Sequence, residues 1–275
     1  MKRHYGNVVL ITGASSGIGK SCADYMVGLG YKVYGTSRKV RENTFEEMGN
    51  GVTMVRMDVC SQDSVKEAVE SIISREGEIG ILVNNAGMGI AGAVEDTSPQ
   101  EAFLQMDTNF FGMHRVVRQV LPHMRKKGSG LIINMSSVGA LFPIPYQSMY
   151  VAAKSAVEGM TGSLRNELRP FGIKVAYVEP GDTKTGFTGS RIMAEDSGEG
   201  SAYHDYCKKS IAVMERDETN GPDPITVARV VAGLAERKSP PVCITVGLKY
   251  KLLVFLKRLV PKALESYLLS KMYEG

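Results

Sequence analysis

The chain has 275 residues, with 33 Lys+Arg against 29 Asp+Glu and 43% hydrophobic residues. The apolar content excludes a disordered or fibrous protein, and the length allows one large buried core. The net charge of +4 is spread along the chain without a block of like charges, so a nucleic-acid binder is not indicated.

The potential metal and disulfide ligands are few and far apart. The four cysteines and four histidines are Cys22, Cys60, Cys207, Cys243, His4, His114, His123 and His204. This scatter fits neither a disulfide framework nor a zinc site, and the first apolar segment, which ends at Gly13, is too short for a signal peptide or a membrane span. We therefore expect a reduced, cytoplasmic protein without a metal site.

Short β-branched runs alternate with longer segments of helical period. Strands are expected at residues 8–11, 32–36, 52–57, 79–83, 131–134, 174–178 and 242–246, and helices at 18–29, 64–73, 110–124 and 150–168. Continuously apolar strands are buried on both faces, which is typical of a parallel sheet covered by helices. The alternation predicts an α/β fold: a Rossmann-type, doubly wound parallel sheet of about seven strands in three layers, forming a single domain over residues 1–275.

Two segments stand apart from this alternation. Residues 186–221 are polar, rich in Gly, Ser and charge, and lack a sustained period, so we expect a substrate lid. Residues 249–275 are expected to form a helical tail whose apolar and basic residues could touch a membrane surface. We favour the alternative that this tail caps the core or a subunit interface.

The first strand runs into the turn T-G-A-S-S-G-I-G, residues 12–19, and then into a helix. Gly13, Gly17 and Gly19 allow a tight turn and a close backbone approach, and the helix N-terminus could hold a pyrophosphate. The spacing is not the standard dinucleotide fingerprint, so a plain tight turn is an equal alternative on this motif alone. A P-loop does not fit, because five residues rather than four separate Gly13 from Gly19.

The end of the second strand bears on the cofactor type. An Asp or Glu there would bind the ribose 2′-hydroxyl of NAD, but the sequence has Ser37-Arg38-Lys39. Arg38 offers a planar fork for a 2′-phosphate, and Ser16 could donate to the same group. This favours NADP(H) over NAD(H); the alternative is that Arg38 and Lys39 are solvated loop charges.

Tyr150 and Lys154 are four residues apart at the start of a predicted helix, so they share a face about 6 Å apart. A nearby ammonium lowers the pKa of a phenol from ~10, which would let Tyr150 act as an acid or base. Y-x-x-x-K alone is common on helices. It gains weight from Ser137 and Asn109, which lie at or beyond the carboxyl ends of predicted strands, where open α/β sheets bind ligands.

Asn84-Asn85-Ala86-Gly87 closes the fourth predicted strand at the same edge. We expect one of the two asparagines to tie strands together and the other to lie along the cofactor.

These motifs in this order, followed by Pro180-Gly181, resemble the short-chain dehydrogenase/reductase family over nearly the whole chain. Residues 106–187 and the tail are similar to its hydroxysteroid- and retinol-type members. The resemblance implies NAD(P)-dependent oxidation of alcohols or reduction of ketones. It also implies that Ser137 polarises the carbonyl, Tyr150 transfers the hydroxyl proton, Lys154 also binds the nicotinamide ribose, and Asn109 holds a water in a proton relay.

The motif and the resemblance together predict a set of cofactor-binding residues, in which Asp58 and Val59 flank the adenine. The set is Gly13, Ser15, Ser16, Gly17, Ile18, Gly19, Ser37, Arg38, Lys39, Asp58, Val59, Asn85, Ala86, Gly87, Tyr150, Lys154, Pro180, Gly181, Thr183 and Thr185. The family usually has an apolar residue two positions beyond the glycine of Pro180-Gly181. Here that position is Thr183 in a polar run, which leaves the contacts there open.

The predicted substrate site is apolar around the reacting hydroxyls. Its residues are Ser137, Phe142, Ile144, Tyr146, Met149, Tyr150 and Phe187. We expect a hydrophobic ketone or secondary alcohol, steroid-like or lipid-like, with reduction by NADPH as the working direction; the alternative for each apolar residue is ordinary core packing. Alternatives for the whole protein are a 3-oxoacyl-thioester reductase and a catalytically silent NADP-binding sensor or scaffold. The two long helices, from Asn109 and from Tyr150, resemble those that form a four-helix dimer contact in this family, and the resemblance implies a homodimer or homotetramer.

Overall fold

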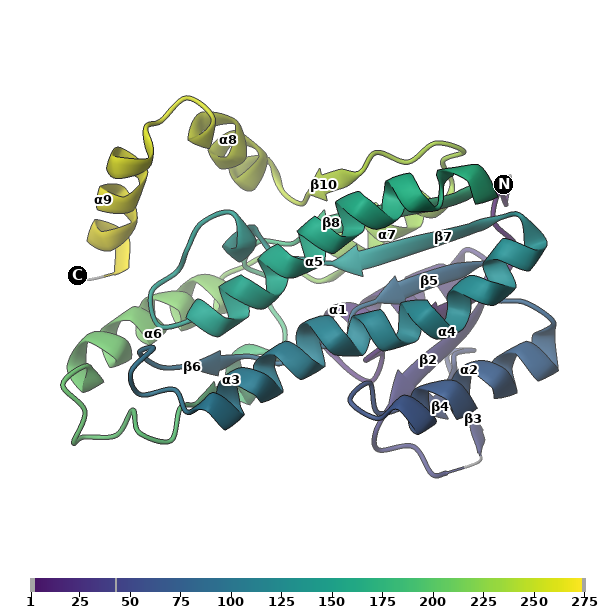
Figure 1. Cartoon of the computed structure of the whole chain (residues 1–275), viewed down its shortest axis with the longest axis horizontal. Helices are drawn as coiled ribbons and strands as arrows, with labels where there is room; N and C mark the ends of the chain where they lie inside the picture. Colours follow the sequence, from purple (N-terminus) through teal and green to yellow (C-terminus); the bar gives the residue numbers. More distant parts are fainter. Residues whose placement is uncertain (1–2, 43, 274–275) are drawn as a thin grey trace.

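The computed structural model describes residues 3–42 and 44–273, and its centre is an eight-stranded sheet with the order β10-β8-β7-β5-β1-β2-β4-β3 (Figure 1). All neighbouring strands are parallel except β3, which runs antiparallel to β4 at one edge. The strands are β1 (Val8–Ile11), β2 (Lys32–Ser37), β3 (Phe45–Glu47), β4 (Thr53–Arg56), β5 (Ile81–Asn84), β7 (Gly130–Met135), β8 (Ile173–Glu179) and β10 (Cys243–Thr245).

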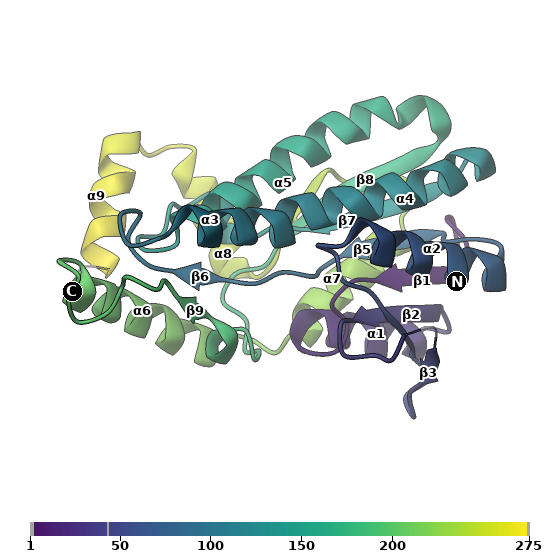
Figure 2. The same ribbon diagram turned by 60° about the horizontal axis from the view of Figure 1, so that its bottom comes forward.

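Helices cover both faces of this sheet. They are α1 (Gly17–Gly28), α2 (Gln62–Glu76), α3 (Pro99–Met106), α4 (Gly112–Lys127), α5 (Ser148–Glu167), α6 (His204–Thr219), α7 (Ile225–Ala235), α8 (Leu248–Lys257) and α9 (Lys262–Tyr273). The layers are α1 and α7 on one side and α2, α4 and α5 on the other, as the two ribbon views show (Figures 1 and 2).

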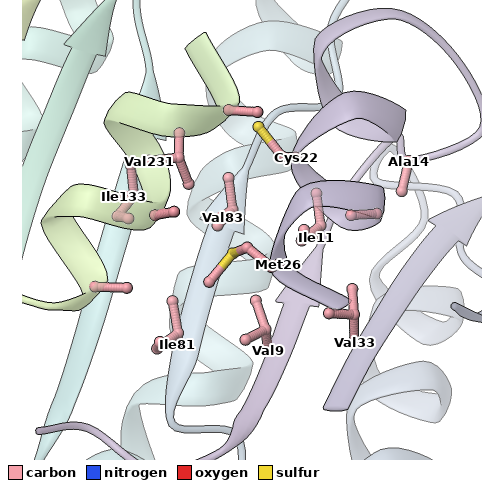
Figure 3. Close-up of a cluster of buried hydrophobic side chains, with 14 of the residues drawn as sticks. Val9, Ile11, Ala14, Cys22, Met26, Val33, Ile81, Val83, Ile133 and Val231 are labelled. Carbon is pink, nitrogen blue, oxygen red and sulfur yellow. The ribbon is translucent and has the colours of Figure 1, made fainter. Parts of the chain in front are cut away.

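The strands are apolar on both sides because both sides are buried. In β1, Val9 and Ile11 pack under α1 and α7, where Met26 is fully buried, whereas Val8 and Leu10 pack in the other layer (Figure 3). A strand alternates its side chains between two faces, so two buried faces require an uninterrupted apolar run. The predicted Rossmann-type, three-layer fold is confirmed, and every predicted strand lies within two residues of its observed bounds.

Several features of the fold were not predicted, among them the helices α3 and α7. The edge strand β3 makes eight strands rather than about seven, and a small parallel pair joins β6 (Ile90–Ala91) to β9 (Ile192–Met193). The polar segment 186–221, expected to lack regular structure, contains the 16-residue helix α6. These strands are only two or three residues long, below the length at which a period-2 pattern can be read.

The strand order indicates at which edge of the sheet a ligand would bind. The order reverses between β1 and β5, and in such sheets ligands bind outside the carboxyl ends of the strands at this point. In Figure 1 the arrowheads of β5 and β7 point toward the end of the molecule where α6, α8 and α9 lie. Segments far apart in sequence therefore surround one edge of the sheet.

The described residues offer neither a membrane-spanning helix nor a metal site. No helix among them is long and apolar enough to cross a membrane. No group of three His, Cys, Asp or Glu side chains within residues 3–42 and 44–273 could hold a metal ion, and the four cysteines are free thiols.

Candidate active site

The glycine-rich turn after β1 forms a cradle that side chains would fill. Gly13 has a φ of +65°, and a Cβ there would lie 2.9 Å from the Cα of Ala86. A Cβ on Gly19 would collide with the Gly13 carbonyl and the Asn85 side chain. Only glycine fits both positions, so the turn lies directly against the chain that leaves β5.

The N-terminus of α1 opens onto this cradle. The side chain of its N-cap, Ser16, makes no capping hydrogen bond, and the first turn carries no acidic residue. The first N–H groups and the positive end of the helix dipole are therefore available to an anion. Thr185 lies across the turn, 3.4 Å from the point where a Cβ of Gly17 would stand. This arrangement fits a dinucleotide pyrophosphate.

The two asparagines after β5 have different partners. Asn84 donates to the Asn134 side chain at 2.9 Å, and Asn134 donates in turn to Thr161, so this residue ties β5 to β7 and α5. Asn85 donates to the backbone carbonyls of Thr12 and Gly13 at 3.0 and 3.1 Å. Asn84 therefore belongs to the framework, and Asn85 holds the cradle to the end of β5.

A pocket of about 190 Å³ lies beside the glycine-rich turn at the end of β2. Ser15, Ser37 and Lys39 contribute to its wall, and Ser37 Oγ accepts from the backbone N–H of Lys39. Arg38 is exposed and does not line this pocket. Of the two predicted cations, the structure brings Lys39 to the turn.

The predicted adenine-flanking pair follows β4. Asp58 accepts the Cys60 N–H at 3.0 Å, which fixes the local turn. Val59 is buried against Gly112, and its carbonyl accepts from Arg115 at 3.2 Å. Both residues lie at the carboxyl edge of the sheet.

The predicted reacting groups meet at the start of α5. Ser137, which follows β7, shares a side-chain hydrogen bond with Tyr150. Lys154 Nζ lies 5.7 Å from the centre of the Tyr150 ring and donates to the Met135 carbonyl at 2.9 Å. The Ser137 hydroxyl thus lies beside a phenol and an amine that are one turn apart on α5.

Burial controls the protonation of these groups. It raises the pKa of Tyr150, against the hydrogen bond from Ser137; Glu218 raises that pKa further, and Arg191 lowers it. Burial lowers the pKa of Lys154 to about 8. The expectation that the ammonium would lower the Tyr150 pKa is wrong for this structure: burial acts most strongly on that pKa and raises it, and the lowering contributions come from Ser137 and Arg191.

Asn109 lies in a π-helical segment, Asp107–Phe111, between α3 and α4. Its amide oxygen accepts the Met88 N–H at 2.8 Å, and its amide nitrogen donates to the Met88 carbonyl at 2.9 Å. Such segments are frequent at functional sites. Here Asn109 fixes the chain that follows Gly87, and its role in a proton relay stays a prediction.

The loop after β8 has a partner that the sequence did not reveal. Tyr250 of α8 packs on Gly181, where a Cβ would collide with its ring, and its hydroxyl donates to the Asp182 carboxylate. The Asp182 N–H donates back to the Tyr250 oxygen at 3.1 Å, and Thr183 Oγ1 donates to the Gly181 carbonyl. The polar run after Pro180 is therefore fastened by the tail.

The predicted substrate residues are only partly gathered around Tyr150. Phe187 lies against Gly89, with its ring centre 6.0 Å from that of Tyr150. Ile144 and Tyr146 pack instead with α6 and Tyr273, in a cluster of apolar side chains.

The other two predicted substrate residues differ in their surroundings. Phe142 faces Lys257 of α8, whose Nζ lies 4.8 Å from the ring centre. Met149 is partly buried in the first turn of α5.

An ion pair in the predicted lid was missed by sequence reasoning. The Arg191 side chain is only 2% exposed and meets Glu218 of α6 at 2.5 Å, while Thr188 donates to the same carboxylate at 2.6 Å. Both charges act on Tyr150. A lone arginine and glutamate 27 residues apart in a polar segment carry no signal that they will pair.

Comparisons with known proteins identify the family to which the chain belongs. Residues 7–196 match the family model for the short chain dehydrogenases, and the chain belongs to that family. It is 45% identical over 240 residues to a 3-ketodihydrosphingosine reductase of Bacteroides thetaiotaomicron, covering 87% of each protein. It is 34% identical to the bovine retinol dehydrogenase 8 over 268 residues, covering 92% of this chain and 85% of the relative.

Among solved structures, a short-chain dehydrogenase from Streptomyces avermitilis superposes with a TM-score of 0.80 at 30% identity, covering 97% of this chain and 99% of that one. Other structures of this fold were solved with NADH, NAD or NADP bound. The chain is therefore an oxidoreductase of this family with a site for a nicotinamide cofactor.

Proposed function

We propose that this protein reduces a ketone on a hydrophobic, lipid-like or steroid-like substrate to a secondary alcohol, using NADPH. The observation that carries the proposal is the placement of Ser137 and Lys154 beside Tyr150 at the carboxyl edge of the sheet, with Lys154 Nζ 5.7 Å from the ring centre. A sensor that only binds a nucleotide has no need for a buried phenol paired with a hydroxyl.

The residues supply the proton half of the reaction, while the nicotinamide, when bound, supplies the hydride. Ser137 donates a hydrogen bond to the substrate carbonyl oxygen, as an oxyanion-hole donor does. Tyr150 gives its phenolic proton to the same oxygen as it becomes an alkoxide. With a pKa of about 8, Lys154 is largely charged at neutral pH and stabilises the phenolate that remains.

The preference for NADP(H) is supported by the end of β2. Ser15, Ser37 and Lys39 face one pocket beside the glycine-rich turn, and Arg38 adds a second cation on the same loop. Two hydroxyls and an ammonium form a suitable site for a 2′-phosphate.

The substrate class is supported from two directions. Phe187 places an aromatic ring 6.0 Å from that of Tyr150, and the Ile144 side chain lies beside Gly139, as Tyr150 does. Two relatives are named for 3-ketodihydrosphingosine, a hydrophobic ketone, and for retinol, a hydrophobic alcohol. We propose the same class here, within a homodimer or homotetramer; the cytoplasmic location stays a prediction.

The test is an NADPH-consumption assay with a panel of long-chain amino ketones, steroid ketones, retinoids and 3-oxoacyl thioesters. We expect turnover of a hydrophobic ketone, loss of at least about 100-fold in Tyr150→Phe, and unchanged NADPH binding in that variant. The matched control is Tyr206→Phe, an exposed tyrosine of α6. Full activity in Tyr150→Phe, or turnover confined to small polar carbonyls, would contradict the proposal, and cofactor binding without any turnover would favour the silent sensor.

A further inference from the structure

Helix α8 exposes large apolar residues to solvent, unlike an ordinary surface helix. Its partly buried side is formed by Tyr250, Val254 and Lys257, so a charged residue faces inward. Its exposed side carries large apolar residues, with Leu248 85% and Phe255 58% exposed. A helix that packs on a protein core normally has the opposite arrangement.

The outer residues of α8 form one continuous stripe. With 3.6 residues per turn, Leu248, Leu252 and Phe255 lie within about 60° of one another around the helix axis, and Leu259 follows in the turn after the helix. All four are at least 58% exposed. The same geometry places Lys249 on one flank of the stripe and Lys251 and Arg258 on the other.

Helix α9 continues the exposed apolar surface. Its exposed large residues are Leu264, Tyr267, Leu268 and Met272. Its inner side holds Tyr273, which packs near α6, and Glu265, which pairs with Lys257 at 2.6 Å. We call the stripe of α8 and these four residues of α9 the apolar tail face. Both helices stand at the end of the molecule beyond the sheet layers (Figures 1 and 2).

Charge identifies the occupant of this face. Within residues 248–273, Glu265 is the sole acidic residue, and its carboxylate faces inward to Lys257. The exposed charged residues there are all basic: Lys249, Lys251, Arg258, Lys262 and Lys271. A second copy of the chain placed on this face would bring like charges together, which disfavours self-association.

We propose that the apolar tail face docks on an anionic lipid membrane surface. A helix that carries Leu and Phe on one side with Lys and Arg on its flanks is suited to lie in the plane of the interface. The apolar residues enter the acyl boundary, while the long lysine side chains extend to the headgroups. If this segment only capped the core, eight large apolar residues would remain exposed to water.

The docked face connects directly to the active site. On its inner side, α8 holds the loop after β8 through Tyr250 and Asp182, and Lys257 contacts the Leu141 carbonyl and the Phe142 ring. A membrane under α8 and α9 would therefore lie next to the loop after β8 and to Phe142, which belong to the predicted cofactor and substrate sites.

The experiment is vesicle flotation with the purified full-length chain and needs no turnover, so its outcome is independent of the proposed reaction. Vesicles of phosphatidylcholine alone are compared with vesicles that contain phosphatidylserine. We expect binding to the anionic vesicles, at least tenfold stronger than to the neutral ones and reduced by high salt.

Two paired variants separate the contributions. Leu252→Ser with Phe255→Ser should weaken binding at least tenfold, and Lys249→Gln with Lys251→Gln should do the same for anionic vesicles alone. The controls are Val94→Ser and Lys66→Gln, exposed residues on other elements, which should bind as the wild type does. Retained NADPH binding shows that each variant is folded.

Three outcomes would overturn the proposal. The first is absence of binding to either vesicle, and the second is equal binding to neutral and anionic vesicles. The third is loss of an oligomer, seen by sedimentation, in Leu252→Ser with Phe255→Ser, which would assign the face to a second copy of the chain.

Discussion

The Tyr250 hydroxyl on α8 and Asp182 in the loop after β8 are joined by two hydrogen bonds, with Tyr250 donating to the carboxylate and accepting from the Asp182 N–H. The Tyr250 ring covers Gly181 so closely that no other residue fits at that position. This contact gives the polar Asp182 a partner, and the next residue, Thr183, where the family resemblance implies an apolar side chain, donates its hydroxyl to the Gly181 carbonyl. The tail and the predicted cofactor loop form one unit.

Removal of the Tyr250 hydroxyl is therefore expected to reach the cofactor site. In Tyr250→Phe the ring still covers Gly181, but Asp182 loses both bonds, which should cost about 1–2 kcal/mol of stability. We expect NADPH binding to weaken several-fold, measured by fluorescence titration. Tyr267→Phe, in the exposed part of the tail, is the control. Unchanged NADPH affinity in Tyr250→Phe would show that the loop keeps its shape without the tail.

The main sheet was predictable because its strands are buried on both faces. Residues 8–11 and 131–133 are uninterrupted apolar runs, each preceded by a glycine within two residues. Helix α6 was not predictable in this way, because only Cys207, Ser210, Ile211 and Met214 of its 16 residues are buried. These four have the i, i+3, i+4, i+7 spacing of a helix face, but one of them is a serine and most of the remaining residues are polar, so the period is weak in the sequence.

The site was predictable to the extent that its residues follow strands. Ser137 lies with Tyr150 and Lys154 because β7 ends at the carboxyl edge of the sheet, beside the start of α5. The partners that determine their electrostatics, Glu218 among them, come from elements whose position depends on tertiary packing. The pKa of Tyr150 was misjudged for this reason, since spacing along a helix carries no information about burial.

The cofactor preference makes a prediction at the end of β2. In Lys39→Glu we expect the Kd for NADPH to rise at least tenfold while the Kd for NADH stays the same or falls, because a carboxylate repels the 2′-phosphate and suits a free hydroxyl. Arg38→Asp should act in the same direction with a smaller effect, since Arg38 lies outside the pocket. Arg41→Asp, further along this exposed loop, is the control, and fluorescence titration with both cofactors is the measurement.

A pH dependence of stability is expected from Glu158, which accepts from Ser136 at 2.6 Å behind the active site. Burial raises the pKa of this carboxyl to about 7, from 4.5. Between these values the folded state binds more protons than the unfolded state, so this group makes stability fall as the pH rises through the window. Above about pH 7 its full destabilising effect is present.

Glu158→Gln should remove that dependence. We expect the variant to be more stable than the wild type by about 1–2 kcal/mol at pH 8 and similar to it at pH 4.5, as measured by urea unfolding across this range. Glu70→Gln, on the exposed side of α2, should leave the profile unchanged. A profile that is equally steep in Glu158→Gln would assign the dependence to another group.

The oligomer prediction concerns the surface shared by α4 and α5. A hollow of about 240 Å³ between these helices is lined in part by Leu121 and Met160. A charge in such a hollow would be buried by a partner helix at a cost of several kcal/mol. We expect Met160→Glu to sediment as a monomer, whereas the wild type and Val94→Glu sediment as a dimer or tetramer. A monomeric wild type at micromolar concentration would contradict this prediction.

The lid pair Arg191 and Glu218 predicts how the reaction depends on pH. Reduction needs the protonated form of Tyr150, so its rate falls as the pH rises through the Tyr150 pKa. The Glu218 carboxylate raises that pKa by disfavouring the phenolate, and the Arg191 guanidinium lowers it.

In Glu218→Gln the charge that raises the Tyr150 pKa is lost, while the charge that lowers it remains, so the pKa should fall. We expect the basic limb of the kcat profile to move to lower pH, measured with saturating NADPH. Glu215→Gln, an exposed position on the same helix, should leave the limb in place. A limb that stays fixed or moves upward in Glu218→Gln would mean that the proton donor is a group other than Tyr150.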